Sequence, residues 1–171
     1  MINKSSYGFD IWLTRGTSFS NVQSIFGADL NGKEVFWKRE YDNLDTQAKI
    51  TWGTAENYIN SKASTLLLGK VGIEKAFASY ATVMGDGFVS NSSVIYNIYC
   101  PKGAKMLYCE PFSAYGHGTM SPNWDGKARQ SSFSYEIEML LQRSTKFRVI
   151  KVEYKITERK WYIDLEVLGQ M

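Results

Sequence analysis

The 171-residue sequence has few of the residues that most often carry catalysis or bind metals: it contains one histidine and two cysteines. A Ser-His-Asp or Cys-His mechanism would depend entirely on His117, which lies between two glycines in a predicted loop. We therefore expect neither mechanism. Neither a metal-ligand spacing of cysteines nor a neighbouring Cys-His pair is present, so we expect no metal.

The two cysteines, Cys100 and Cys109, form at most one pair. A disulfide between them stays open, but a single pair is not the framework that stabilises small secreted domains. We expect two free, buried thiols.

Long apolar segments and strong charge are also missing. No apolar run reaches the length of a membrane-spanning helix, and no apolar signal region follows residues 1–6. We expect a soluble protein that does not bind membranes, and export would need a trimmed signal or a route without one. The net charge of +3 includes no dense basic cluster, so nucleic acid is not an expected partner.

The composition is that of a globular chain, with 44% hydrophobic, 22% charged and 15% aromatic residues. A length of 171 residues suits one domain with a sizeable core, and no repeat or linker divides it. We expect a single domain over residues 1–171.

The N-terminal half is predicted to be mainly helical after a first strand at residues 9–14. A capping-box pattern at Ser20 and Gln23 starts a short helix that ends at Gly27. Residues 32–47 are predicted as loop and short helix, and residues 49–52 as a strand. Residues 71–84 are predicted as a helix because apolar residues recur at helical spacing: Ile73, Ala76, Phe77, Tyr80 and Ala81.

The C-terminal half is predicted to be rich in strands, at residues 94–100, 106–110, 135–141, 146–154 and 160–168. Alternation is clearest in the last of these, and residues 157–159 look like a hairpin turn. Residues 111–134 form a long loop of the kind that is often functional. The order of elements predicts an α+β domain with a mostly antiparallel sheet.

Glu136 and Glu138 open the strand at residues 135–141. Side chains two apart on a strand share a face and lie roughly 7 Å apart. Such a pair on a rigid strand suits chemistry in which one carboxylate stabilises positive charge and the other handles a proton. In isolation, a Glu-x-Glu pair more often lies on a solvated face of a strand. Whether this pair is catalytic therefore depends on its sequence context.

That context resembles the mono-ADP-ribosyltransferase toxins of the Arg-Ser-Glu class. The segment Ile95–Lys105 looks like their strand followed by Pro-Lys-Gly-x-Lys, and Tyr108–Tyr115 is similar to a segment of the Rho-modifying clostridial exoenzymes. Glu136–Phe147 matches the family's catalytic strand and the turn after it. Arg15, followed by a short helix, is similar to the opening of the cholera toxin A chain.

The resemblance implies an ADP-ribosyltransferase-like fold, with mixed, mostly antiparallel sheets around an NAD cleft and short N-terminal helices. It implies NAD as substrate, no metal, and transfer of ADP-ribose to a protein arginine. Glu138 would stabilise the positive charge that builds on the ribose, and Glu136 would orient or deprotonate the acceptor arginine. The family members with glutamate at the first position usually modify arginine.

For the dinucleotide, the resemblance implies that Arg15 and Gly16 bind the phosphates, since a guanidinium can do so bidentately. A structural salt bridge is the alternative role for Arg15. The serine of the family's aromatic-x-Ser-Thr-Ser motif has two candidates. Ser64 and Thr65 leave room for a connection before the strand at residues 94–100. Ser90 and Ser92 match the motif better but lie too close to the start of that strand. We prefer Ser64 on this topology.

Phe133 and Tyr135 lie in the part of the chain that recognises the protein substrate in the family, so the resemblance makes them candidate contacts; packing of both in the core is the alternative. The expected role is a bacterial or phage toxin or effector, secreted or delivered into a target cell, with a delivery or binding subunit as a further candidate partner. Two alternatives are an NAD glycohydrolase that uses water as acceptor, and a catalytically inactive β-rich binding domain.

Overall fold

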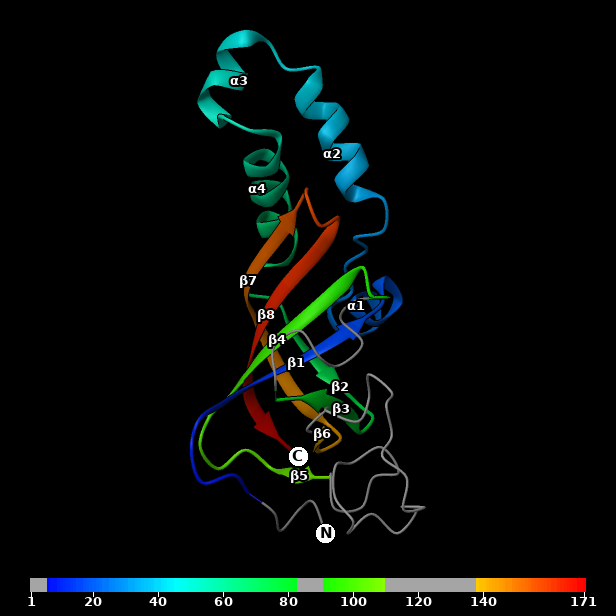
Figure 1. Ribbon diagram of the computed structural model, residues 1–171, viewed down its shortest axis with the longest axis vertical. Coiled ribbons are helices and arrows are strands. Elements are labelled where there is room, and N and C mark those ends of the chain that lie inside the picture. The colour runs from blue at the N-terminus through cyan, green and yellow to red at the C-terminus, as the bar shows by residue number, and fades with distance from the viewer. Residues whose placement is uncertain (1–5, 83–90, 110–137) are drawn as a thin grey trace, which may run out of the picture.

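The computed structural model describes residues 6–82, 91–109 and 138–171. Figure 1 shows an elongated molecule in which three helices gather at one end, beyond the tips of two long strands, and the C-terminus lies towards the other end. None of the described helices is long and apolar enough to cross a membrane.

The described residues form a single eight-stranded sheet, in the order β2-β7-β8-β4-β1-β3-β6-β5. Of the neighbouring pairs, β4 and β8 are parallel and the rest are antiparallel. The strands are β1 (Ile11–Thr17), β2 (Val71–Glu74), β3 (Ala78–Ala81), β4 (Val94–Cys100), β5 (Met106–Tyr108), β6 (Glu138–Leu141), β7 (Thr145–Lys155) and β8 (Lys160–Gln170). This arrangement confirms the predicted α+β class, with one continuous sheet.

In the part of the chain that the structure describes, four helices precede most of the sheet: α1 (Phe19–Phe26), α2 (Lys33–Asp42), α3 (Thr46–Trp52) and α4 (Ala55–Leu67). Polar side chains cap three of them, because Ser18, Asp45 and Thr54 each accept a hydrogen bond from a backbone N–H in the first turn. The N-cap of α1 is thus Ser18, not the predicted Ser20, while the predicted stop at Gly27 is confirmed by its left-handed conformation (φ 67°).

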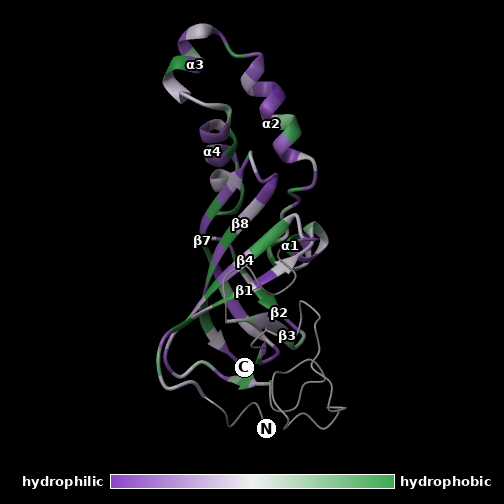
Figure 2. Ribbon diagram, viewed as in Figure 1, coloured by the Kyte–Doolittle hydropathy of each residue, from purple (hydrophilic) through white to green (hydrophobic). Residues whose placement is uncertain are grey.

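The core lies between the sheet and the helices. Trp161, Ile163, Leu165 and Val167 on β8 are buried in the predicted alternation, and α4 packs on β7. Trp37 of α2 meets Trp161 edge-on, with ring centroids 6.2 Å apart. Figure 2 shows the contrast between a largely hydrophilic α2 and a largely hydrophobic β4.

The helix predicted at residues 71–84 is wrong in the part that the structure describes, which forms β2 and β3. Two side chains of the predicted apolar stripe, Ile73 and Phe77, are exposed. Gly72 lets α1 pack directly against the extended β2, because a Cβ there would lie 2.2 Å from the backbone oxygen of Ile25.

The strand predicted at residues 49–52 is also wrong, since these residues belong to α3. The predicted strands at 94–100, 146–154 and 160–168 are confirmed within one or two residues at each end. So is the turn at 157–159, where Arg159 has φ 55°. Both cysteines are free, Cys100 buried and Cys109 partly so. The predicted loop at 111–134 lies outside the described residues.

Candidate functional site

Glu138 and Ser79 come together where β3 pairs with β6. Ala81 lies opposite Glu138 and Ser79 lies opposite Leu140, so Ser79 and Glu138 project from one face of the sheet. The Ser79 hydroxyl donates a hydrogen bond of 2.6 Å to Oε1 of Glu138. Ser79 is exposed and Glu138 is half-buried. A carboxylate held at a fixed place in an accessible position is therefore available to a ligand.

Cys109 adjoins the backbone of this pair. Its N–H donates a 2.9 Å hydrogen bond to the carbonyl oxygen of Glu138. Burial, followed by the nearby charge of Glu138, raises the pKa of the Cys109 thiol. The thiol therefore stays protonated at neutral pH and does not compete as a nucleophile.

Arg15 lies on the neighbouring strand β1, with its guanidinium carbon 5.6 Å from the centre of the Tyr80 ring. Burial raises the pKa of Tyr80, and the charge of Arg15 partly opposes this shift. Within residues 6–82, 91–109 and 138–171, Arg15 has no carboxylate within ion-pair distance. A structural salt bridge is therefore not what holds it in this part of the chain.

The register of the strands separates Arg15 from the Ser79–Glu138 pair. Thr14 lies opposite Ala81, and Arg15 lies opposite Tyr96. Because successive side chains alternate between faces, Arg15 shares the face of Tyr80 and Tyr96, whereas Ser79 and Glu138 share the other. Ser79 and Glu138 are therefore in contact, and Arg15 lies on the strand next to Ser79 but on the opposite face of the sheet.

Ser79 was not predicted, and the serine that was preferred lies elsewhere. Ser64 and Thr65 are in α4, where the Thr65 hydroxyl donates to the backbone oxygen of Ser61, so the strand expected for this motif is wrong. The signal for Ser79 is the sequence Phe77-Ala78-Ser79, an aromatic-x-Ser pattern. It is weak because Tyr80 and Ala81 replace the threonine and second serine of the motif.

The other predicted site residues lie apart from the Ser79–Glu138 pair or outside the described residues. Gly16 lies in β1 opposite Ile95, and Ser92 lies two residues before β4. Glu136, Phe133, Tyr135 and Ser90 lie outside the described residues. No group of three or more His, Cys, Asp or Glu side chains that could hold a metal ion occurs among the residues that the structure describes.

The chemistry open to the Ser79–Glu138 pair is electrostatic. A carboxylate fixed by a hydroxyl needs no reorganisation to face a positive charge that develops beside it, and this preorganisation favours a cationic transition state. Departure of a leaving group from a sugar carbon creates such a charge. Among the described residues, this pair is the arrangement that best suits a transition state of this kind.

Comparison with known proteins agrees with this chemistry. The family model of the ADP-ribosyltransferase exoenzymes matches residues 32–170, a segment that includes Ser79 and Glu138 but not Arg15. No curated protein matches the chain by sequence.

Several solved structures share the fold. C3stau2 from S. aureus, solved with NAD, has a TM-score of 0.64 at 20% identity over 99% of this chain and 66% of its own. The C3 exoenzyme of Clostridium limosum has a TM-score of 0.60 at 17% identity, covering 98% and 64%. The Plx2a toxin of Paenibacillus larvae has a TM-score of 0.59 at 18% identity, covering 98% and 66%. The chain thus spans slightly less than two thirds of the length of these structures.

Proposed function

Because the chain belongs to the ADP-ribosyltransferase exoenzyme family, we propose that it cleaves NAD at the nicotinamide–ribose bond and transfers ADP-ribose to an arginine of a target protein. The observation that carries the proposal is the 2.6 Å hydrogen bond between Ser79 and Glu138 on adjoining strands. It fixes one carboxylate on an accessible face of the sheet. The resemblance in sequence independently assigns the central role to Glu138.

In the proposed reaction, the bond between the ribose carbon and the nicotinamide nitrogen breaks, and its electron pair neutralises the nicotinamide ring. The ribose carbon then carries positive charge, which the Glu138 carboxylate stabilises. A guanidinium nitrogen of the acceptor attacks this carbon and loses a proton. Glu136, two residues before Glu138 in the sequence, takes that proton.

Arg15 and Gly16 are the proposed contacts of the NAD phosphates. The support for Arg15 is a guanidinium with no carboxylate partner among the described residues, on the strand next to Ser79. Arg15 lies on the face of the sheet opposite Glu138, so its role as a phosphate contact does not follow from the role proposed for Glu138. It therefore needs its own test.

We extend the proposal to the biological role: residues 1–171 act as one catalytic domain of a toxin or effector, secreted or delivered into a target cell, with a delivery or binding subunit as a further partner. The support is the family together with structural neighbours that are themselves named toxins, such as Plx2a. Phe133 and Tyr135 are the proposed contacts of the target protein.

The experiment is incubation of the full chain with NAD and host-cell protein, followed by mass spectrometry of arginine residues and assay of free nicotinamide. Wild type should release nicotinamide and modify arginine. Glu136→Gln should lose arginine modification and retain NAD hydrolysis. If wild type releases nicotinamide and modifies no arginine, the chain is an NAD glycohydrolase. If it releases none and calorimetry shows no NAD binding, the proposed activity fails.

A further inference from the structure

Strand β2 forms one edge of the sheet, and among the described residues it pairs with β7 alone. An edge strand presents backbone N–H and C=O groups that can pair with a strand of another chain. Proteins usually protect such an edge with charged side chains, or cover it with a helix or loop. The protection of β2 therefore indicates whether its edge is available to a partner.

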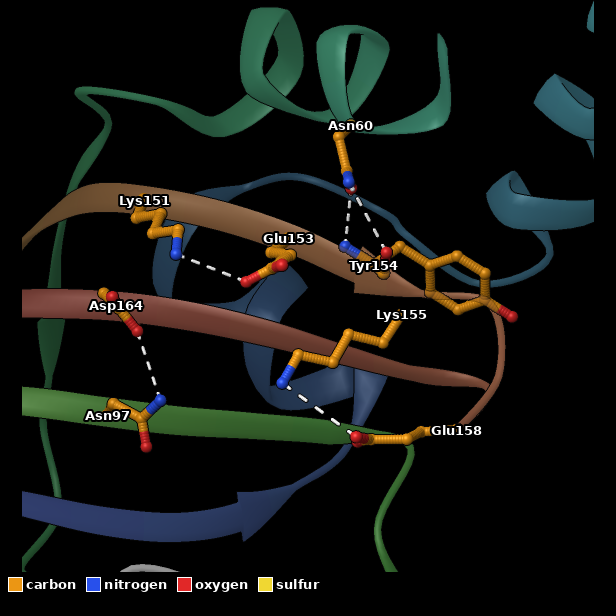
Figure 3. A network of polar contacts seen from close by, with 8 residues as sticks. All are labelled: Asn60, Asn97, Lys151, Glu153, Tyr154, Lys155, Glu158 and Asp164. Carbon is orange, nitrogen blue, oxygen red and sulfur yellow. Dashed lines mark hydrogen bonds and ion pairs between the residues drawn. The ribbon is translucent and has the colours of Figure 1, made fainter. Parts of the chain in front are cut away.

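The neighbouring edge of β7, beyond the end of β2, is protected by helix α4. The side chain of Asn60 accepts a hydrogen bond from the Tyr154 N–H at 2.6 Å and donates one to the Tyr154 carbonyl oxygen at 3.5 Å (Figure 3). The carboxylate of Glu56, on the same helix, accepts from the Ile156 N–H at 3.0 Å. The helix thus satisfies backbone groups that the sheet leaves unpaired here.

The edge at β2 has exposed apolar side chains instead. Val71 and Ile73 project from the face of the sheet opposite α1, and they are 46% and 36% exposed. Leu68, shortly before the strand, is exposed as well. Within the described residues, neither Lys70 nor Glu74 lies within ion-pair distance of an opposite charge. This edge therefore lacks the protection that β7 has.

Hydrogen bonds to β7 determine which backbone groups of β2 point outwards. The Val149 N–H donates to the carbonyl oxygen of Lys70 at 2.9 Å, so the backbone groups of Val149 point towards β2. This direction alternates along a strand, so those of Phe147 also point towards β2, where Phe147 pairs with Gly72. Gly72 therefore faces β7. The residues on either side of it present their N–H and C=O groups at the free edge.

We propose that β2 pairs with β2 of a second copy of this chain, antiparallel and with a two-fold axis at Gly72. Only residues whose backbone groups point outwards can form hydrogen bonds in such a pairing. With the axis at Gly72, Val71 of each copy lies opposite Ile73 of the other. Each of these pairs exchanges two hydrogen bonds between the chains, and its apolar side chains meet on one face. The inference does not rest on the proposed function.

The charges at the two ends of β2 select the same register. Lys70 lies two residues before Gly72 and Glu74 lies two residues after it. The two-fold axis therefore places each Lys70 opposite Glu74 of the other copy, where opposite charges stabilise a strand pair. Hydrogen bonds from Asn21 and from the Ala76 N–H hold the Glu74 carboxylate in place, both at 3.3 Å. A shift of the register by two residues would instead place Lys70 or Glu74 opposite Gly72.

The first test is sedimentation velocity of the 171-residue chain at several concentrations, with circular dichroism to check the fold. The dimer fraction of wild type should rise with concentration. Ile73→Pro should abolish the dimer, because proline removes an outward N–H and leaves the hydrogen bonds to β7 intact. Wild type that stays monomeric at concentrations up to about 1 mM would overturn the proposal.

The second test exchanges the charges. Lys70→Glu places two glutamates opposite each other and Glu74→Lys places two lysines there, so each variant alone should dimerise about tenfold more weakly. An equimolar mixture of the two variants should recover the dimer, because every charge then meets its opposite. Arg39→Glu, at an exposed position in α2, is the matched control and should dimerise like wild type.

Two results of these experiments would contradict the proposed pairing. One is a mixture of the two folded charge variants that dimerises no better than either alone. The other is a wild-type dimer that Lys70→Glu and Ile73→Pro leave unchanged, which would place the contact between copies elsewhere. Ile73→Pro keeps the test decisive if a charge variant does not fold, since it changes an exposed side chain of the edge.

Discussion

Two glutamates in this molecule occupy opposite kinds of surroundings. Glu138 lies on an accessible face of the sheet and accepts a hydrogen bond from Ser79. Glu34 lies in α2, and its Oε2 atom is buried with no hydrogen-bond partner among the residues that the structure describes. A carboxylate that is already held in place suits a charge that appears during reaction, whereas a buried oxygen without a partner lowers stability. The same residue type thus indicates catalysis in one region and a cost in stability in the other.

The largest expected effect is on the Ser79–Glu138 pair. Glu138→Gln keeps the shape of the side chain and removes the charge, so the rate of nicotinamide release should fall by about 10²–10³. Circular dichroism should show an unchanged fold, because Glu138 is only half-buried. Wild-type turnover in this variant would show that Glu138 does not stabilise the transition state.

Arg15 lies on the strand next to Ser79 but on the other face of the sheet, so it tests the binding of the NAD phosphates separately from the chemistry at Glu138. Arg15→Gln should raise the KM for NAD about tenfold with a smaller change in kcat, because a charged phosphate contact is lost. An unchanged KM, together with a lower melting temperature, would mean that Arg15 serves only to pack over Tyr80.

Ser79→Ala should have a smaller effect than Glu138→Gln on the same assay. It leaves the charge in place and removes the hydrogen bond that orients it, so we expect about a tenfold loss of kcat. The matched control is Ser64→Ala in α4, which should leave kcat unchanged. A larger loss of kcat in Ser64→Ala than in Ser79→Ala would indicate that Ser64, the serine preferred from the sequence, is the motif serine.

The smallest expected effect is on stability. Replacing the unsatisfied Glu34 with an apolar residue of similar size, Glu34→Met, should raise the free energy of unfolding by about 1 kcal/mol, since the buried oxygen no longer lacks a partner. The measurement is urea unfolding without ligand. Destabilisation by Glu34→Met would show that the carboxylate is satisfied in solution and would remove the contrast with Glu138.

How much the sequence could predict differs along the chain. In β8, four apolar residues alternate over seven positions, and no helical spacing competes with that pattern. In β2 and β3 the strands are only four residues long, and exposed Ile73 and Phe77 happen to fall at helical spacing with buried Tyr80. When short strands carry apolar residues on both faces, the spacing of apolar residues in the sequence does not distinguish them from a helix.

The candidate site shows a similar limit. Glu138 and Arg15 were predicted because charged residues stand out in a motif, whereas Ser79, which the structure places beside Glu138, was not predicted because Tyr80 and Ala81 depart from the motif. The contact between Ser79 and Glu138 had no signal either, since the two residues are 59 positions apart and meet only where β3 pairs with β6. Chemistry built from distant residues appears only once the packing is known.

The central claim is that NAD is cleaved beside Ser79 and Glu138. The most direct measurement is a crystal structure of the Glu138→Gln chain with NAD, in which slow turnover keeps the substrate intact. We predict the nicotinamide ribose against Ser79, within hydrogen-bond distance of residue 138. A nicotinamide ribose bound against Ser64 or Ser92, away from β3 and β6, would contradict the account.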